Sequence, residues 1–120
     1  MLRKGDKMRR LNVLLVEEDA PLRTMLEIIL EKEGCAVTSK RSYDFDLVKS
    51  YDLYLLSHNV RGNFITGSIW LKSYKDRIPK DQRVLIDDGW DDVEGYKLRK
   101  PFTITPLMRI IEDYRLQVLE

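Results

Sequence analysis

Residues 11–21 read LNVLLVEEDAP, and this stretch decides the class of fold. Its first six residues are an aliphatic run, which is typical of a strand buried on both faces of a sheet. The run ends at Glu17, Glu18 and Asp19, and Pro21 then suits the first turn of a helix. Asp19 is well placed as the N-cap, because its carboxylate can accept hydrogen bonds from the free N–H groups of that turn. The stretch therefore predicts a buried strand that leads directly into a helix.

The same alternation of strand and helix continues along the chain. Further short apolar runs predict strands at residues 35–38, 53–56, 83–86 and 96–99. Apolar residues at helical spacing predict a helix at residues 20–33 and a C-terminal helix that Thr105 caps with Pro106 at its first position. Residues 43–49 and 66–76 also read as helices. Strands that alternate with helices imply parallel pairing with helical crossovers, and hence a doubly wound α/β sheet.

Length, composition and charge set limits on the function. The 120 residues suffice for one domain, and 43% hydrophobic with 34% charged residues describe a globular protein rather than a disordered one. No apolar run approaches the roughly 20 residues of a membrane-spanning helix, and the basic residues 1–10 lack the apolar stretch of a signal peptide. The lone Cys35 excludes an internal disulfide, so a cytoplasmic location is expected. A net charge of +1 gives no reason to expect nucleic-acid binding.

Polar side chains follow four of the predicted strands. Glu17 and Glu18 follow the first strand, Ser57 the third, Asp87 the fourth and Lys100 the fifth. In a doubly wound sheet, functional groups gather beyond the carboxyl ends of the strands, where the strand order reverses. Helix capping accounts for one acid after the first strand but not for two more. These five residues are therefore the candidates for a functional site.

Three segments, in this order, resemble the receiver domains of two-component response regulators. Residues 13–23 (VLLVEEDAPLR) are similar to the family's first strand with its acidic pair. Residues 51–56 (YDLYLL) are similar to the third strand, which runs into the phosphorylated aspartate, and Lys100-Pro101-Phe102 to the corner whose lysine contacts the phosphoryl group. The resemblance spans residues 11–120 and implies five parallel strands in the order 2-1-3-4-5 with helices on both faces. Residues 1–10 are then a basic tail that precedes the receiver-like domain.

The position that resembles the phosphate acceptor holds Ser57 instead of an aspartate. The family's carboxylate attacks a phosphohistidine and also binds Mg²⁺, whereas a serine hydroxyl is a weak nucleophile without a base and a poor magnesium ligand. His58 is the nearest candidate base, but consecutive strand residues point to opposite faces, so we expect it to face away. The usual phosphorylation cycle should therefore be absent, and neither a catalytic residue nor enzyme activity is expected.

Asp87 occupies the place where the family carries a threonine or serine that moves to bind the phosphoryl group. An anion there would repel a phosphoryl group but pair with Lys100. We therefore expect Asp87, or the Glu17–Glu18 pair, to hold Lys100 in a standing ionic network; the alternative is that Asp87 is only a turn residue before Gly89. Glu17, Glu18 and Asp87 form an acidic pocket that also offers oxygen ligands to Mg²⁺. Because one central ligand is missing, weak binding through Glu17 and Glu18 is the most that we expect, and no cofactor is required.

The segment between Asp87 and Lys100 is short. Residues 88–99 include Gly89 and Gly95, and they leave little room for the helix that most receivers place there. The fourth helix is therefore expected to be shortened or missing. The surface through which many receivers dimerise or dock their outputs would change with it.

Three classes of function remain. We expect a phosphorylation-independent receiver that acts as an interaction and signalling module, whose partner is a protein such as a histidine kinase, another receiver, an output domain or a second copy of the chain. The alternative is a receiver that is still switched by another residue, a metal or a ligand at the acidic pocket. An enzyme is least favoured, since the sequence has no nucleophile–base pair, phosphate-binding glycine loop or metal-binding motif of a familiar kind.

Overall fold

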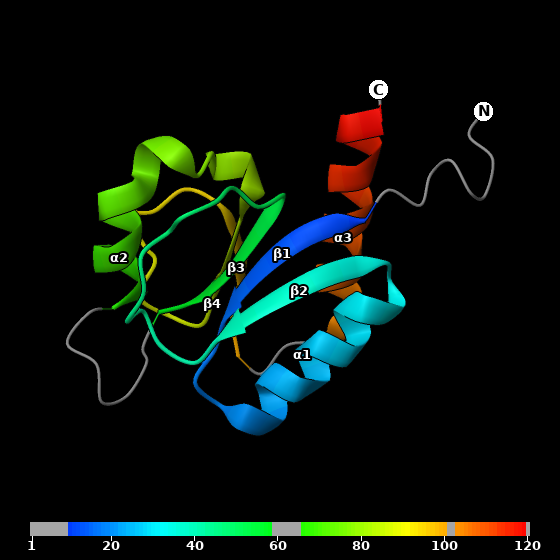
Figure 1. Cartoon of the computed structure of the whole chain (residues 1–120), viewed down its shortest axis with the longest axis horizontal. Helices are drawn as coiled ribbons and strands as arrows, with labels where there is room; N and C mark the ends of the chain where they lie inside the picture. Colours follow the sequence, from blue (N-terminus) through cyan, green and yellow to red (C-terminus); the bar gives the residue numbers. More distant parts are fainter. Residues whose placement is uncertain (1–9, 59–65, 101–102, 120) are drawn as a thin grey trace.

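Five parallel strands form the sheet at the centre of the molecule. The computed structural model describes residues 10–58, 66–100 and 103–119, so the predicted tail is outside this part except for Arg10. The strand order is β2-β1-β3-β4-β5, as predicted, and every neighbouring pair is parallel (Figure 1). The strands are β1 (Leu11–Val16), β2 (Cys35–Lys40), β3 (Leu53–Ser57), β4 (Arg83–Ile86) and β5 (Tyr96–Leu98).

Helices lie on both sides of this sheet. Within the described residues, α1 and α3 cover one face and α2 covers the other (Figure 1). None of these helices is long and apolar enough to cross a membrane. The helices are α1 (Ala20–Lys32), α2 (Gly67–Tyr74) and α3 (Ile104–Leu119), with two short 3₁₀ helices, η1 (Lys75–Arg77) and η2 (Lys80–Gln82), between α2 and β4.

The two faces of the sheet have different cores. Alternate residues of β1 contribute to each, which is why almost the whole strand is apolar. We call the core under α1 and α3 the aliphatic face; it contains Leu11, Val13, Leu15, Leu26, Leu30, Cys35, Leu53, Leu55, Val84, Ile86, Leu98, Leu107, Ile110, Ile111 and Tyr114. We call the core on the side of α2 the aromatic face; it contains Leu14, Val16, Tyr43, Leu47, Tyr54, Leu56, Trp70, Leu71, Ile78, Leu85 and Trp90.

The predicted helix at residues 43–49 is wrong, because residues 41–52 form bends and coil between β2 and β3. Tyr43 and Leu47 have the spacing of neighbours on a helix, and both are buried in the aromatic face, but from coil. Aspartates at positions 44 and 46 and aromatic residues at 43 and 45 are poor helix formers. A helix this short forms too few backbone hydrogen bonds to offset the free-energy cost of nucleation. Packing of the side chains therefore decides the conformation of this segment.

The connection between β4 and β5 has no helix, as the short segment predicts. Residues 87–95 form turns and bends. Asp87 and Gly89 adopt positive φ angles of 77° and 105°, which turn the chain back over the sheet. Trp90 then covers the strands in place of a helix: it is 2% exposed, and its indole N–H donates to the carbonyl of Ile86 at 3.0 Å.

The starts of α1 and α3 differ in how well the sequence predicts them. Asp19 is the N-cap of α1, as predicted, and its side chain accepts from the N–H of Leu22 at 2.9 Å. Thr105 is not the cap of α3, because this helix begins one residue earlier, at Ile104. Pro106 is thus its third residue, where a proline is tolerated because first-turn N–H groups have no partner within the helix.

Candidate functional site

Three of the predicted site residues meet at the carboxyl edge of the sheet. Glu17 follows β1, Ser57 ends β3, and Arg99 separates Lys100 from β5. Since parallel strands end at one edge, residues far apart in the sequence come together there. Glu17 and Ser57 are 2% and 1% exposed, whereas the side chain of Lys100 is 30% exposed. The site is therefore a buried acid and a buried hydroxyl beneath a half-buried cation; Pro101, beside it in the sequence, lies outside the described residues.

Glu17 is the centre of this cluster, and both of its carboxylate oxygens are engaged. Its Oε1 accepts a hydrogen bond from the Ser57 hydroxyl at 2.6 Å and pairs with Lys100 Nζ at 2.9 Å. Its Oε2 accepts from the backbone N–H of Asp19 at 3.0 Å. A buried carboxylate is costly unless a cation and hydrogen-bond donors compensate it. Lys100, Ser57 and the Asp19 N–H together supply that compensation.

Asp87 lies outside the Glu17 cluster. Its N–H donates to the carbonyl of Leu98 at 2.8 Å, and its carboxylate accepts from the N–H of Asp88 at 2.9 Å. With its positive φ angle, these are the contacts of a turn residue. Among the described residues, the ion-pair partner of Lys100 is Glu17 and not Asp87. The other acid of the predicted pocket, Glu18, is half-buried, and its carbonyl accepts from Arg23 at 3.1 Å.

Ser57 is enclosed by three residues that the sequence patterns do not single out. The Tyr43 hydroxyl donates to the carbonyl of Ser57. A Cβ added to Gly67 would lie 2.8 Å from the same carbonyl and 2.6 Å from the indole of Trp90, so only glycine fits there. No spacing rule links these positions, and a tyrosine and a tryptophan in polar loops are the only signals of a buried role.

His58 is directed away from the Glu17 cluster, as the alternation of strand residues predicts. Its ring meets the indole of Trp90 edge-on, with centroids 5.1 Å apart, and its Nε2 lies 3.0 Å from the Ser68 hydroxyl. Gly89 lies against the other side of the ring, where an added Cβ would be 2.4 Å from Nδ1. The group bonded to the Ser57 hydroxyl is therefore Glu17 rather than His58.

The electrostatics of the cluster keep its tyrosine neutral. Burial raises the pKa of Tyr43 well above its usual value of 10.0, and the negative charge of Glu17 raises this pKa further. Tyr43 therefore remains a hydrogen-bond donor at neutral pH. The Tyr43 hydroxyl thus donates to the Ser57 carbonyl beside the Glu17 cluster as a neutral group.

The cluster does not fit a magnesium ion. Mg²⁺ requires near-octahedral oxygen ligands and is usually bound through one or two carboxylates. Both oxygens of Glu17 are engaged, and the ammonium of Lys100, at 2.9 Å from Oε1, would repel a second cation there. In residues 10–58, 66–100 and 103–119, no three His, Cys, Asp or Glu side chains form a group that could hold a metal ion.

Solved structures resemble this chain closely in fold and weakly in sequence. NtrX from Brucella abortus is 21% identical with a TM-score of 0.70; the match covers 91% of this chain but only 28% of NtrX. The response regulator TrrA from Thermotoga maritima, solved with Mg²⁺ and BeF, is 19% identical with a TM-score of 0.70, covering 86% of this chain and 97% of TrrA. The receiver domain of the sensor histidine kinase PA1611 from Pseudomonas aeruginosa, solved with a magnesium ion in its active-site cleft, is 20% identical with a TM-score of 0.67, covering 89% and 98%.

These likenesses define the fold. No model of a known protein family matches the sequence, and no curated protein matches it. The five-stranded order and the similarity of three-dimensional structure are nevertheless those of response regulator receiver domains. The match covers less than a third of the NtrX chain and nearly all of the TrrA chain and of the PA1611 receiver-domain chain.

Proposed function

We propose that this chain is a receiver domain of two-component signalling that acts through protein contacts and is not phosphorylated at the acceptor position. The Glu17–Ser57–Lys100 cluster is the observation that carries this proposal. It lies at the carboxyl ends of β1, β3 and β5, and the resemblance to receiver domains puts the acceptor position at the end of the third strand. The Ser57 hydroxyl and the Lys100 ammonium both contact the Glu17 carboxylate, so each of the three groups already has a partner within the cluster.

Ser57 is poorly suited to replace the acceptor aspartate. A serine becomes a nucleophile only when a base removes its proton. Glu17 accepts the hydroxyl hydrogen bond through Oε1, but the same oxygen is also paired with the ammonium of Lys100. Ser57 is also only 1% exposed, so its hydroxyl has little contact with solvent from which a phosphate donor could approach.

The partner in this proposal is a protein, such as a histidine kinase, another receiver, an output domain or a second copy of the chain. The structures similar to this chain include a response regulator and the receiver domain of a sensor histidine kinase. We also infer a cytoplasmic location, where such partners work. A metal-switched receiver is the rival, and it requires Mg²⁺ to displace Lys100 from Glu17.

The test is exposure to acetyl phosphate or beryllofluoride with Mg²⁺. Tryptophan fluorescence is a suitable signal, because the indole of Trp90 packs against Gly67 beside Ser57. We expect neither a fluorescence change nor an added phosphoryl mass in the intact protein. TrrA, which has been solved with Mg²⁺ and BeF, is the control for binding of beryllofluoride under the same conditions. A phosphoryl adduct or a saturable fluorescence change in the native chain would contradict the proposal.

A matched variant tests why the native chain is expected not to respond to beryllofluoride. Glu17→Asp, Glu18→Asp and Ser57→Asp together give the chain the carboxylates that are usual in the family. This triple variant should gain a magnesium-dependent response to beryllofluoride, because shorter acids and a third carboxylate form a set of oxygen ligands. If magnesium alone changes the fluorescence of the native chain in a saturable way, the metal-switched alternative is correct instead.

A further inference from the structure

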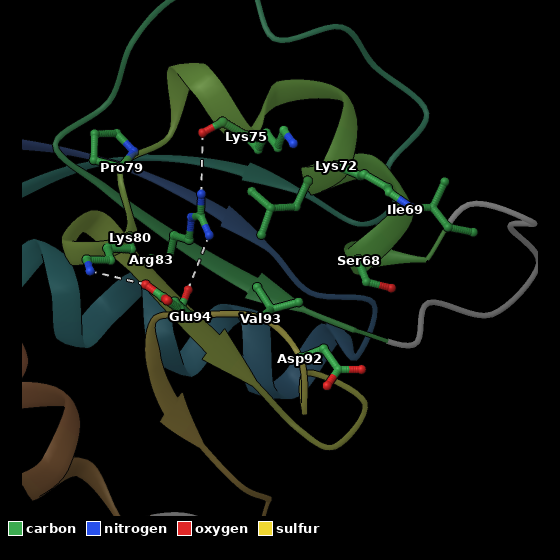
Figure 2. Close-up of a pocket in the computed structure, with 11 residues that line it drawn as sticks. Ser68, Ile69, Lys72, Lys75, Pro79, Lys80, Arg83, Asp92, Val93 and Glu94 are labelled. Carbon is green, nitrogen blue, oxygen red and sulfur yellow. Dashed lines mark hydrogen bonds and ion pairs between the residues drawn. The ribbon is translucent and has the colours of Figure 1, made fainter.

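A groove lies beside α2, on the aromatic side of the sheet, and its lining does not include the residues of the Glu17 cluster (Figure 2). One wall is α2 with its following turn, and the other is the coil that contains Val93 and Glu94. Arg83 of β4 lies between the two walls. The volume of the groove is about 680 Å³, within the roughly 300–1,000 Å³ that is usual for binding clefts. We refer to it as the α2 groove.

The missing fourth helix explains why this groove is open. A crossover between parallel strands is usually a helix that covers one face of the sheet. Here residues 87–95 make the crossover without one. Trp90 fills the inner part and is 2% exposed, but the chain then runs on as coil past Val93, which is only half-buried. The space beside α2 that a helix would cover is therefore left as a groove.

The groove combines apolar surface with positive charge. Ile69 is 54% exposed at its edge, and Leu71 and Val93 also line it. The charged lining residues are four cations and two acids, which gives a net charge of +2 (4 − 2); they are Lys72, Lys75, Lys80, Arg83, Asp92 and Glu94. Ile69 and Lys72 are three residues apart on α2, so the cation flanks the exposed apolar side chain.

One of the two acids of the groove is already paired with a cation on its own wall. Glu94 is paired with Lys80 at 3.2 Å on the far wall. The guanidinium of Arg83 is fixed by backbone carbonyls, at 2.9 Å from Ile78 and 3.3 Å from Glu94, and it keeps its charge. Lys72 and Lys75 thus remain as the cationic rim on the α2 side (Figure 2).

We propose that the α2 groove binds an amphipathic helix of a partner protein, with an apolar ridge on Ile69 and Val93 and flanking acids on Lys72 and Lys75. A helix fits because it replaces the covering element that the β4–β5 crossover lacks, and helices dock in apolar grooves through residues at i, i+3, i+4 and i+7. The flanking acids follow from the positive charge of the rim. The chain's own N-terminal stretch is basic, so it has the wrong sign for this site. This inference rests on the proposed function, because it names the partner's binding segment.

The experiment uses two fluorescein-labelled synthetic helices of about 15 residues, near the length at which isolated helices become stable. Both carry the same leucine ridge, one flanked by glutamates and the other by lysines. In fluorescence anisotropy titrations at low salt, we expect the full chain to bind the glutamate helix at least about tenfold more tightly than the lysine helix. Backbone amide NMR shifts should locate the binding at Ile69 and Val93.

Charge-reversal variants provide the matched test. Lys72→Glu with Lys75→Glu should abolish binding of the glutamate helix, and Ile69→Asp should weaken it. Lys32→Glu with Arg109→Glu makes the same change in net charge on exposed positions of α1 and α3, and it should leave binding unchanged. Equal binding of both helices, or equal effects of the two double variants, would overturn the proposal. It would also be overturned if sedimentation showed a dimer that only Lys72→Glu with Lys75→Glu dissociates, since the occupant would then be a second copy.

Repeating the titration with acetyl phosphate and Mg²⁺ separates this inference from the proposed function. If the glutamate helix binds in the groove only after acetyl phosphate is added, the groove is a helix-binding site, but the proposed independence from phosphorylation is wrong. If the helix binds under neither condition and acetyl phosphate does not modify the chain, the proposed binding of a helix in the groove is wrong and the proposed function stands.

Discussion

The cores on the two faces of the sheet are built from different kinds of side chain. The aliphatic face is covered by two regular helices, and tyrosine at position 114 is its single aromatic residue among those buried there. The aromatic face is covered by one short helix and two stretches of coil, and it buries Tyr43, Tyr54, Trp70 and Trp90. Large rings therefore gather where helices are lacking.

Hydrogen bonding explains this difference. A helix satisfies its own backbone, so aliphatic side chains suffice beneath it. Coil and strand ends carry backbone groups that need partners when they are buried. Aromatic rings fill a large volume and also carry a polar atom: Trp90 donates to the carbonyl of Ile86, Trp70 to that of Phe45 and Tyr43 to that of Ser57. On the aromatic face, the same side chains thus supply both the core and the hydrogen bonds.

The largest effect is expected from removing the ring that replaces the fourth helix. Trp90→Ala should lower the free energy of unfolding by about 3–5 kcal/mol, because it creates a cavity and also leaves the Ile86 carbonyl without its indole donor. Leu30→Ala, on the aliphatic face, should cost about 2–5 kcal/mol from the cavity alone. Urea unfolding followed by far-UV circular dichroism gives both values.

Trp90→Phe sharpens this comparison, since it keeps a ring but loses the N–H. Its cost should lie between zero and that of Trp90→Ala. If Trp90→Ala proved nearly neutral, the coil of residues 87–95 would not depend on the indole, and the account of the aromatic face would be wrong.

The sequence predicts the regular strands and α1 better than the coil that covers part of the aromatic face. Periodic apolar runs indicate β1 and β4 with their observed bounds and α1 with its cap at Asp19. Residues 41–52 are bends and coil, so the helix predicted at residues 43–49 is absent, although Tyr43 and Leu47 are four residues apart. Tertiary contacts decide that segment, and they leave no local signal.

The candidate site shows the same limit. Strand-end positions predict that Glu17, Ser57 and Lys100 lie at one edge, because the topology alone brings them together. The choice of Glu17 over Asp87 as partner of Lys100 depends on the positive φ angle of Asp87, which no sequence pattern predicts. Tyr43, which encloses Ser57 from coil, could not be predicted either.

A smaller effect is expected at the edge shared by both faces, where the buried ion pair lies. Lys100→Met should cost about 1–3 kcal/mol, because it leaves the buried carboxylate of Glu17 without its cation. Glu17→Gln combined with Lys100→Met should cost less than the sum of the two single changes, since the residues are in direct contact. Unfolding in urea at neutral pH measures the four proteins of this cycle.

An exposed ion pair provides the control for that cycle. Lys80 and Glu94 are 3.2 Å apart, with side chains 71% and 72% exposed. Lys80→Met should cost at most about 1 kcal/mol, as is usual for surface pairs. The role assigned to the Glu17 cluster is untenable if Lys100→Met costs no more than Lys80→Met.

The smallest expected effect is the loss of stability at alkaline pH, to which the two faces contribute in different pH ranges. Burial raises the pKa of the Cys35 thiol, on the aliphatic face, above its usual 9.0. Burial likewise raises the pKa of both Tyr43 and Tyr54, on the aromatic face, above their usual 10.0. Above the usual pKa of each group, the folded protein holds a proton that the unfolded chain has released, so stability falls as pH rises. The loss should begin near pH 9 through Cys35 and steepen beyond pH 10 through the tyrosines.

Two variants assign each part of this alkaline loss to its face. Cys35→Ala should remove the decline between pH 9 and 10 and leave the steeper one. Tyr43→Phe should lose about 1 kcal/mol at neutral pH, the usual net value of a hydrogen bond, and should flatten the decline above pH 10, which Tyr54 alone then maintains. Thermal unfolding across alkaline pH measures both slopes. A Tyr43→Phe variant with the native slope above pH 10 would mean that the coil-covered face opens before its tyrosine ionises, and that this face is held less tightly than the hydrogen bond to Ser57 implies.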